Sequence, residues 1–289
     1  MPQLSLSSLS RHFAGICVLL GSLGLGGAFA QVPKTQLTVG VLPNVSARLI
    51  YSSYQPLDAY LERITGHSVD IQTAKDFKEF NARTLAGDYD LVVTAPNLGR
   101  LAQIDGKWDL LAVYEPAIPA LLVTLKSNSN SGVDQLRGKS LALANPQSLV
   151  ALAGLQWLKT QGLQVGTDYT IAMAANEDSL GTLLKTGEAP LAMMSQGEFN
   201  AKTSEMKQLL RISTTFAQIP GFFVLANPKM TPAERQSLKN TLMGFQKSAE
   251  WNSFSDLSGV KAIRDLSKSD ISFIDPFVEM TRASLNGAR

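Results

Sequence analysis

Two apolar runs that end in small or polar turns place the strongest constraint on the fold of this chain. The runs are LTVGVLP, from Leu37 to Pro43, and YDLVVTAPN, from Tyr89 to Asn97. Both are strand-like, and two helical segments and one further strand-like segment lie between them. Because ligands of open α/β sheets bind beyond the carboxyl ends of the strands, the turns after these runs are the first candidates for a binding site.

The segment between the two runs predicts an alternation of helices and strands. Five apolar residues recur at helical spacing before Gly66, which can end the helix: Ile50, Tyr54, Leu57, Leu61 and Ile64. A strand is expected over residues 69–73, and Asp76 with Glu79 predicts the start of a second helix. This βαβαβ order predicts a parallel sheet with right-handed crossovers.

The next part of the chain predicts a passage from one lobe to another. Strand-like residues 110–114 and 118–126 are separated by Glu115-Pro116-Ala117, which leaves no room for a helix. Pro220-Gly221 marks a second crossing. We therefore expect one lobe of residues 31–115 and 221–289 and a second lobe of residues 116–220. Two such α/β lobes enclose a cleft that can close by hinge motion.

Within the second lobe we expect strands over residues 140–144, 170–174 and 190–195, with helices from Ser148 and from about Asn176. The C-terminal part opens with a capping box over residues 231–234 that has proline at the first helical position. Its helix carries Leu238, Leu242 and Phe245 and is expected to pack on the first lobe.

The N-terminus has the order of a cleavable secretory signal, so we expect a periplasmic protein. A basic pair, Arg11 and His12, precedes an apolar stretch from 13 to 25 and then Ala28-Phe29-Ala30. The stretch is shorter than the ~20 residues that a spanning helix needs, which disfavours the alternative of an uncleaved anchor. Cleavage after Ala30 removes the single cysteine, Cys17, and leaves no thiol for a disulfide or a metal.

Composition disfavours several functional classes. Removing residues 1–30 of 289 leaves 259 residues, takes Lys+Arg from 26 to 25 and leaves Asp+Glu at 24, a net charge of about +1. Such a balance predicts no nucleic-acid partner. His67 is the only histidine after residue 30, no metal-ligand spacing stands out, and no glycine motif for nucleotides is present. We expect neither an enzyme nor a cofactor.

The order of these segments resembles the substrate-binding proteins of phosphate, phosphite and phosphonate ABC transporters. The stretches that carry the resemblance run from about Leu37 to Ser284: VGVLPNVSARLIYSSYQPLDAYLERITGHSV, AKDFKEFNARTLAGDYDLVVTAPN, LRGKSLALANPQS, GEAPLAMM, IPGFFVLANP and FIDPFVEM. Their order and spacing are more specific than any one of them. The resemblance implies the α/β, two-lobe type II periplasmic-binding-protein fold, with a hinged interlobe cleft.

The resemblance also implies ligand-binding positions, several of which differ here. Phosphonate-binding members of the family have a Ser-Thr-Ser-Gly run at a helix start. At the equivalent positions of this chain only Ser148 keeps a hydroxyl, and Leu149 and Val150 follow it. This chain has Phe77 at a position that is often tyrosine in the family, and Asn176 at a position that is often histidine. An expected acidic residue falls near Ser195 or Gln196, neither of which is charged. A larger, less charged or more apolar ligand is therefore at least as well favoured as a phosphonate.

Each candidate also has a structural explanation. Ser148 and Asn176 are good helix caps in any protein, and Phe77 shares a helical stripe with Phe80. Asn44 and Asn97 can either cap the next helix or contact the ligand. The predicted ligand-binding set comprises Asn44, Phe77, Thr94, Asn97, Ser148, Asn176 and Gln196.

The function expected from these observations is that of a monomeric solute-binding protein of an ABC transporter. It would bind a phosphate- or phosphonate-like oxyanion, or a divergent small molecule, and present it to a membrane permease. The alternative is a periplasmic ligand-sensing protein that acts on a membrane sensor. Closed and open lobes expose different surfaces, so either partner could distinguish loaded from empty protein.

Overall fold

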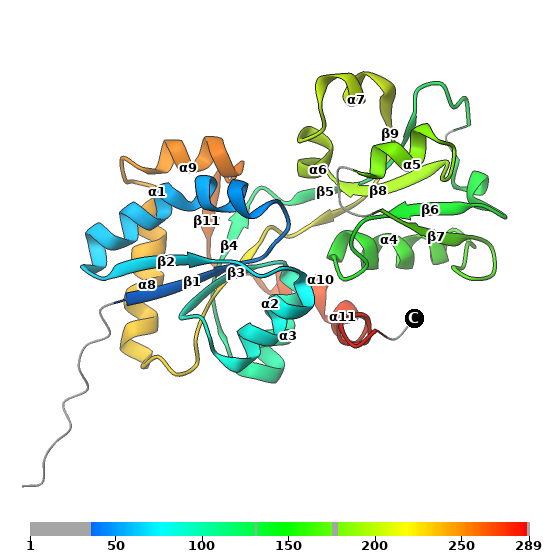
Figure 1. Cartoon of the computed structure of the whole chain (residues 1–289). Helices are drawn as coiled ribbons and strands as arrows, with labels where there is room; N and C mark the ends of the chain where they lie inside the picture. Colours follow the sequence, from blue (N-terminus) through cyan, green and yellow to red (C-terminus); the bar gives the residue numbers. More distant parts are fainter. Residues whose placement is uncertain (1–35, 131, 175–178, 288–289) are drawn as a thin grey trace, which may run out of the picture. The chain divides into compact units, whose positions relative to one another are not determined.

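The computed structural model describes residues 36–130, 132–174 and 179–287, which form two mixed sheets (Figure 1). Sheet A has the strand order β11-β4-β10-β3-β1-β2, with β1 (Gln36–Val41), β2 (Ser68–Gln72), β3 (Leu91–Thr94), β4 (Asp109–Glu115), β10 (Phe223–Ala226) and β11 (Ala262–Arg264). Sheet B has the order β7-β6-β8-β5-β9, with β5 (Ile118–Leu125), β6 (Ser140–Leu143), β7 (Thr170–Met173), β8 (Leu191–Ser195) and β9 (Leu210–Ile219).

The parallel pairing predicted from the first half of the chain is confirmed. β1 pairs in parallel with β2 on one side and β3 on the other, and β6 pairs in parallel with β7 and β8. All four residues of β3 are buried, which explains its uninterrupted apolar sequence. The α/β fold class is therefore present in both sheets.

Helices cover both faces of sheet A (Figure 1). On one face α1 (Ala47–Thr65), α8 (Pro232–Phe245) and α9 (Trp251–Ser258) share a core with Leu91 and Val93. On the other face α2 (Phe77–Ala86) and α3 (Pro96–Gly106) pack with Val92. The alternation along β3 sends neighbouring side chains to opposite faces. The prediction that the helix after Thr231 packs on the first sheet is confirmed by its buried Leu242.

Local signals predicted these helices well. Asp76 caps α2 by accepting a hydrogen bond from the Glu79 N–H, and Thr231 with Glu234 forms the predicted capping box of α8. Gly66 ends α1 in the left-handed conformation. The predicted buried face of α1 is wrong at the C-terminal end of the helix, because Ile64 is 48 % exposed. Tyr60, which the prediction did not include, is buried in the core.

The helices that follow the strands of sheet B are η1 (Val133–Leu136), α4 (Leu149–Thr160), α5 (Leu180–Lys185), α6 (Gln196–Asn200) and α7 (Ser204–Leu209). The predicted helix start at Asn176 lies outside the described residues. The chain ends with α10 (Lys268–Ile274), η3 (Asp275–Phe277) and α11 (Val278–Leu285). α11 packs against α3 and also contacts α4.

The two crossings between the sheets are paired with each other. β4 is antiparallel to β10 in sheet A, and β5 is antiparallel to β9 in sheet B. Between these pairs the Tyr114 N–H donates to the Phe222 carbonyl over 2.9 Å. At Gly221 a Cβ atom would lie 2.0 Å from the Tyr114 carbonyl oxygen, so only glycine allows the two crossings to approach this closely.

Candidate functional site

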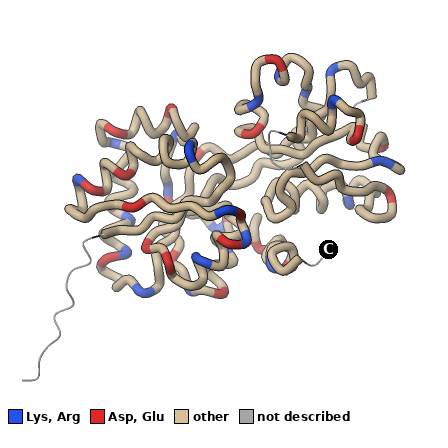
Figure 2. The backbone as a smooth tube through the Cα atoms, viewed as in Figure 1, with Lys and Arg blue, Asp and Glu red and all other residues tan. Residues whose placement is uncertain are grey.

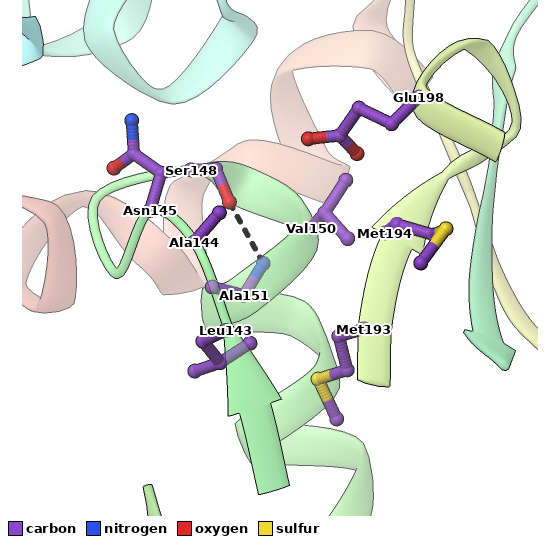
Figure 3. Close-up of a pocket in the computed structure, with 9 residues that line it drawn as sticks. All are labelled: Leu143, Ala144, Asn145, Ser148, Val150, Ala151, Met193, Met194 and Glu198. Carbon is purple, nitrogen blue, oxygen red and sulfur yellow. Dashed lines mark hydrogen bonds between the residues drawn. The ribbon is translucent and has the colours of Figure 1, made fainter. Parts of the chain in front are cut away.

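A small hollow lies at the start of α4, where the ends of β6 and β8 meet the first residue of the helix (Figure 3). Its volume is about 10 Å³, about the space of one water molecule. The lining residues come from two strands and two helix starts: Leu143, Ala144, Asn145, Ser148, Val150, Ala151, Met193, Met194 and Glu198. This is the position at which open α/β sheets bind ligands.

Ser148 holds the first turn of α4 in place. Its Oγ accepts a hydrogen bond from the Ala151 N–H over 3.1 Å, and its carbonyl accepts one from the Leu152 N–H. The structural role of Ser148 is therefore realised, because its hydroxyl is already engaged as the N-cap.

The backbone of this turn still offers hydrogen-bond donors. The N–H groups of Leu149 and Val150 have no acceptor among the described residues. Together with the helix dipole, they favour an anionic or acceptor group at this end of α4.

Glu198 brings a carboxylate to the same hollow (Figure 3). It is the third residue of α6, and with Ser195 it forms a capping box in which its carboxylate accepts from the Ser195 N–H while the Ser195 Oγ accepts from the Glu198 N–H. Glu198 is a residue of the hollow that the sequence did not predict, because the resemblance places the acidic residue directly after the strand, near Ser195 or Gln196. The signal was nevertheless present as Ser195-x-x-Glu198, a capping-box pattern.

The other two candidates of the second lobe do not line this hollow. Gln196 is half-buried, and its side-chain amide donates to the Asn200 side chain over 2.8 Å within α6. Asn176 lies outside the described residues.

Three of the four candidates near sheet A, namely Phe77, Thr94 and Asn97, are buried. Phe77 is 5 % exposed and packs in the core beside Phe80, as its structural explanation predicted. Thr94 and Asn97 are 1 % and 0 % exposed. Asn44 is half-buried in the turn after β1, where its N–H donates to the Leu42 carbonyl over 2.8 Å.

Asn97 links three elements through its side-chain amide. Nδ2 donates to the Gln147 carbonyl and to the Thr281 Oγ1, each over 3.1 Å. Among the described residues, the Asn97 Oδ1 and the Thr94 Oγ1 have no hydrogen-bond partner. Sequence reasoning missed the link from Asn97 to α11, because no local pattern connects residues so distant in the chain.

The described residues show neither a metal centre nor a membrane span. No group of three or more His, Cys, Asp or Glu side chains comes close enough there to hold a metal ion. None of the helices in the described part of the chain is long and apolar enough to cross a bilayer. Basic and acidic residues are interspersed along the backbone of both sheets and their helices (Figure 2). The polar groups that line the hollow are able to form hydrogen bonds and to pair with a charge.

Two mixed α/β sheets joined by two crossings define a periplasmic binding protein of type II. The family model for an ABC transporter, phosphonate, periplasmic substrate-binding protein matches residues 39–271. The chain belongs to this family, whose members are periplasmic binding proteins for transport rather than enzymes. The resemblance stated from the sequence is thereby confirmed.

Solved structures agree with this fold at low sequence identity. PhnD1 from Prochlorococcus marinus in complex with methylphosphonate has a TM-score of 0.74 and 14% identity, covering 88% of this chain and 99% of that one. A binding protein component of an ABC phosphonate transporter from Pseudomonas aeruginosa has a TM-score of 0.74 and 12% sequence identity, and the match covers 88% of this chain and 89% of that one. The aliphatic sulphonate binding protein SsuA from Escherichia coli has a TM-score of 0.63 and 14% sequence identity, and the match covers 86% of this chain and 92% of that one. A sequence search among curated proteins finds no match.

Proposed function

We propose that this protein binds a small compound that carries both an oxyanion and an amine, with the oxyanion at the start of α4 and the amine toward Glu198. The observation that supports this proposal is that groups favouring a negative and a positive partner line the same hollow. The hollow has room for about one water molecule, so the rest of the ligand would lie outside it, in the proposed cleft between the lobes. The free N–H groups of Leu149 and Val150 favour a negative group, whereas the Glu198 carboxylate favours a positive one.

Electrostatic magnitudes support an ammonium group on the ligand. Two like charges 4 Å apart repel each other by about 1 kcal/mol in bulk water and by about 4 kcal/mol at the effective dielectric constant of a protein surface. The helix terminus contributes only about 0.3–1 kcal/mol to anion binding at exposed sites. A carboxylate that lines the same hollow therefore disfavours a simple oxyanion there, and an amine on the ligand offsets that repulsion.

The related structures support the acidic half of such a ligand. PhnD1 was solved in complex with methylphosphonate, and SsuA is an aliphatic sulphonate binding protein. Both ligand classes carry a tetrahedral oxyanion on a small organic group. Glu198 supplies a carboxylate close to Ser195 and Gln196, where the family resemblance implies an acidic residue, and this charge disfavours a purely apolar ligand.

The larger mechanism that we propose uses two lobes, residues 31–115 with 221–289 and residues 116–220. The division is supported by the strands of sheet A, which come from 36–115 and 223–264, and those of sheet B, which come from 118–219. The lobes would close on the ligand by a hinge motion that pivots about the contacts of α4 with α3 and α11, and the loaded form would dock on the membrane permease of the transporter. Residues 1–30 would direct export and then be removed.

Isothermal titration of the mature protein with matched probes tests the ligand class. We expect 2-aminoethylphosphonate to bind more tightly than ethylphosphonate, which lacks the amine, and than ethanolamine, which lacks the acid. A Glu198→Gln variant should lose about 10- to 100-fold in affinity for the aminophosphonate, because hydrogen bonds to charged groups contribute about 1.5–3 kcal/mol. The same variant should bind ethylphosphonate more tightly than the wild type does, because the repulsion between two negative charges is removed.

Glu234→Gln is the matched control, since Glu234 has the same capping-box role at α8, on an exposed surface. It should leave the affinity of every probe unchanged. Equal affinity for ethylphosphonate and 2-aminoethylphosphonate would contradict the proposed ligand class.

A further inference from the structure

A buried chain of hydrogen bonds runs from α11 to the residue before the cap of α4. The Thr281 Oγ1 donates to the Phe277 carbonyl over 2.7 Å and accepts from the Asn97 Nδ2 over 3.1 Å. The second hydrogen of that amide reaches the Gln147 carbonyl over 3.1 Å. Both Asn97 and Thr281 are 0 % exposed, so neither side chain can exchange these bonds for water.

The Gln147–Ser148 peptide is held at both of its polar groups. Its carbonyl accepts from Asn97, and its N–H, which belongs to Ser148, donates to the Asn145 carbonyl over 3.2 Å. The plane of this peptide sets the direction in which Ser148 enters α4. Ser148 in turn caps the helix, so the position of the free N–H groups at Leu149 and Val150 depends on this peptide.

A second hydrogen bond supports the same segment from α11. The Ser284 Oγ donates to the Pro146 carbonyl over 3.2 Å. The two consecutive carbonyls before Ser148 are therefore both bound by side chains from elsewhere in the fold.

Apolar packing surrounds these bonds. Leu149 and Leu152 of α4 lie in the same buried cluster as Leu98 of α3 and Phe277 of η3. In such surroundings a hydrogen bond is stronger than in water, and a group that loses its partner bears the full cost of its desolvation.

We propose that Asn97 and Thr281 are positioning residues of the binding site, which fix the first turn of α4 from α3 and α11 without contacting the ligand. The inference rests on the proposed function, because it takes the start of α4 as the place where the ligand's oxyanion binds. It assigns a role in binding to the C-terminal helix α11 and makes Asn97 a support for the site rather than a ligand contact.

Hydrogen exchange of the ligand-free mature protein tests this role independently of ligand identity. The Ala151 and Leu152 amides, which donate to the Ser148 Oγ and carbonyl, report on the first turn of α4. Thr281→Val removes the hydroxyl and keeps the shape of the side chain. We expect it to speed exchange at these two amides by about five-fold, the effect of one net hydrogen bond.

Two variants separate positioning from general loss of stability. Thr281→Ser keeps a hydroxyl and should restore slow exchange. Thr241→Val removes a hydroxyl that makes the same type of bond to its own helix, to the Ser237 carbonyl of α8, and should leave α4 unchanged. Unchanged exchange at Ala151 and Leu152 in Thr281→Val, or an equal increase in Thr241→Val, would overturn the inference.

Titration with 2-aminoethylphosphonate then distinguishes this inference from the proposed function. If both are correct, Thr281→Val binds the probe about five-fold more weakly than the wild type and Thr281→Ser binds it normally. If the wild type does not bind the probe although Thr281→Val loosens the α4 turn, the ligand class is wrong and the positioning role stands. If the variant binds the probe as tightly as the wild type, the link between α11 and binding is refuted.

Discussion

The residues predicted to bind ligand have different surroundings at the two sheets. Near sheet A, Phe77, Thr94 and Asn97 are buried, and Phe77 is part of the core. At sheet B, Ser148 lines a hollow together with the carboxylate of Glu198. Both regions have polar residues after a parallel strand. Ser148 lies beside free backbone donors and a carboxylate at one small cavity, whereas the sheet A candidates Phe77, Thr94 and Asn97 are buried.

The comparison shows that position after a strand is a weak criterion for ligand contact. The strand end supplies a turn and a helix start in either case. Whether its side chains meet a ligand depends on what packs over them: Thr281 of α11 lies against Asn97, whereas a small hollow that Glu198 also lines lies at the start of α4.

The largest expected effect concerns Phe77 as a core residue. Phe77→Ala should lower the free energy of unfolding by about 3–5 kcal/mol, because a buried aromatic side chain leaves a cavity. Urea unfolding measures this loss. Leu85→Ala, on the same helix at a residue that is 39% exposed, should change stability by less than about 0.5 kcal/mol. A stable Phe77→Ala protein that no longer binds ligand would make Phe77 a ligand platform after all.

A smaller effect is expected at Asp270, another buried polar group of the sheet A region. The Arg264 guanidinium, which donates to both of its oxygens, lowers the pKa of Asp270 from 3.8 to about 2. Because the folded pKa lies below the unfolded one, the stabilisation is complete above about pH 5 and is lost as the pH falls toward 2. One pKa unit corresponds to 1.36 kcal/mol, so the contribution is about 2 kcal/mol.

Urea unfolding of wild type and Asp270→Asn at several pH values measures this contribution. The variant should be less stable by about 2 kcal/mol at pH 7, and the difference should shrink as the pH approaches 2. Asp265→Asn, at a side chain that is 71% exposed, is the control and should show almost no difference. A pH-independent gap between wild type and Asp270→Asn would show that packing, not charge, is what Asp270 contributes.

The smallest effect on stability, but a selective one on binding, is expected at Ser148. Ser148→Ala should lower the free energy of unfolding by about 1 kcal/mol, since it removes the N-cap of α4, and it should also weaken ligand binding. Ser46→Ala is a matched control, because Ser46 occupies the N-cap of α1 without a side-chain hydrogen bond. Unchanged affinity in Ser148→Ala, measured by titration calorimetry, would refute a role for this cap in binding.

Most of the fold was predictable because its signals are local. The apolar runs of β1 and β3, the caps Asp76 and Thr231, and the turn at Gly66 each depend on residues within one or two turns of each other. The site was only partly predictable. Ser148 follows from its neighbours, whereas Asn97 reaches Gln147 across 50 positions and Thr281 across 184. Such contacts are set by packing, which one sequence does not reveal.

Gly221 determines how the two crossings between the sheets can bend. Because Gly221 has no side chain, the two crossings lie against each other. They form one antiparallel two-stranded ribbon, not two separate single strands. A ribbon of this kind resists sliding of one strand past the other, since sliding breaks the hydrogen bonds between them, but it twists and bends as a unit. We therefore expect the backbone of residues 114–118 and that of residues 219–222 to bend together when the two sheets move relative to each other.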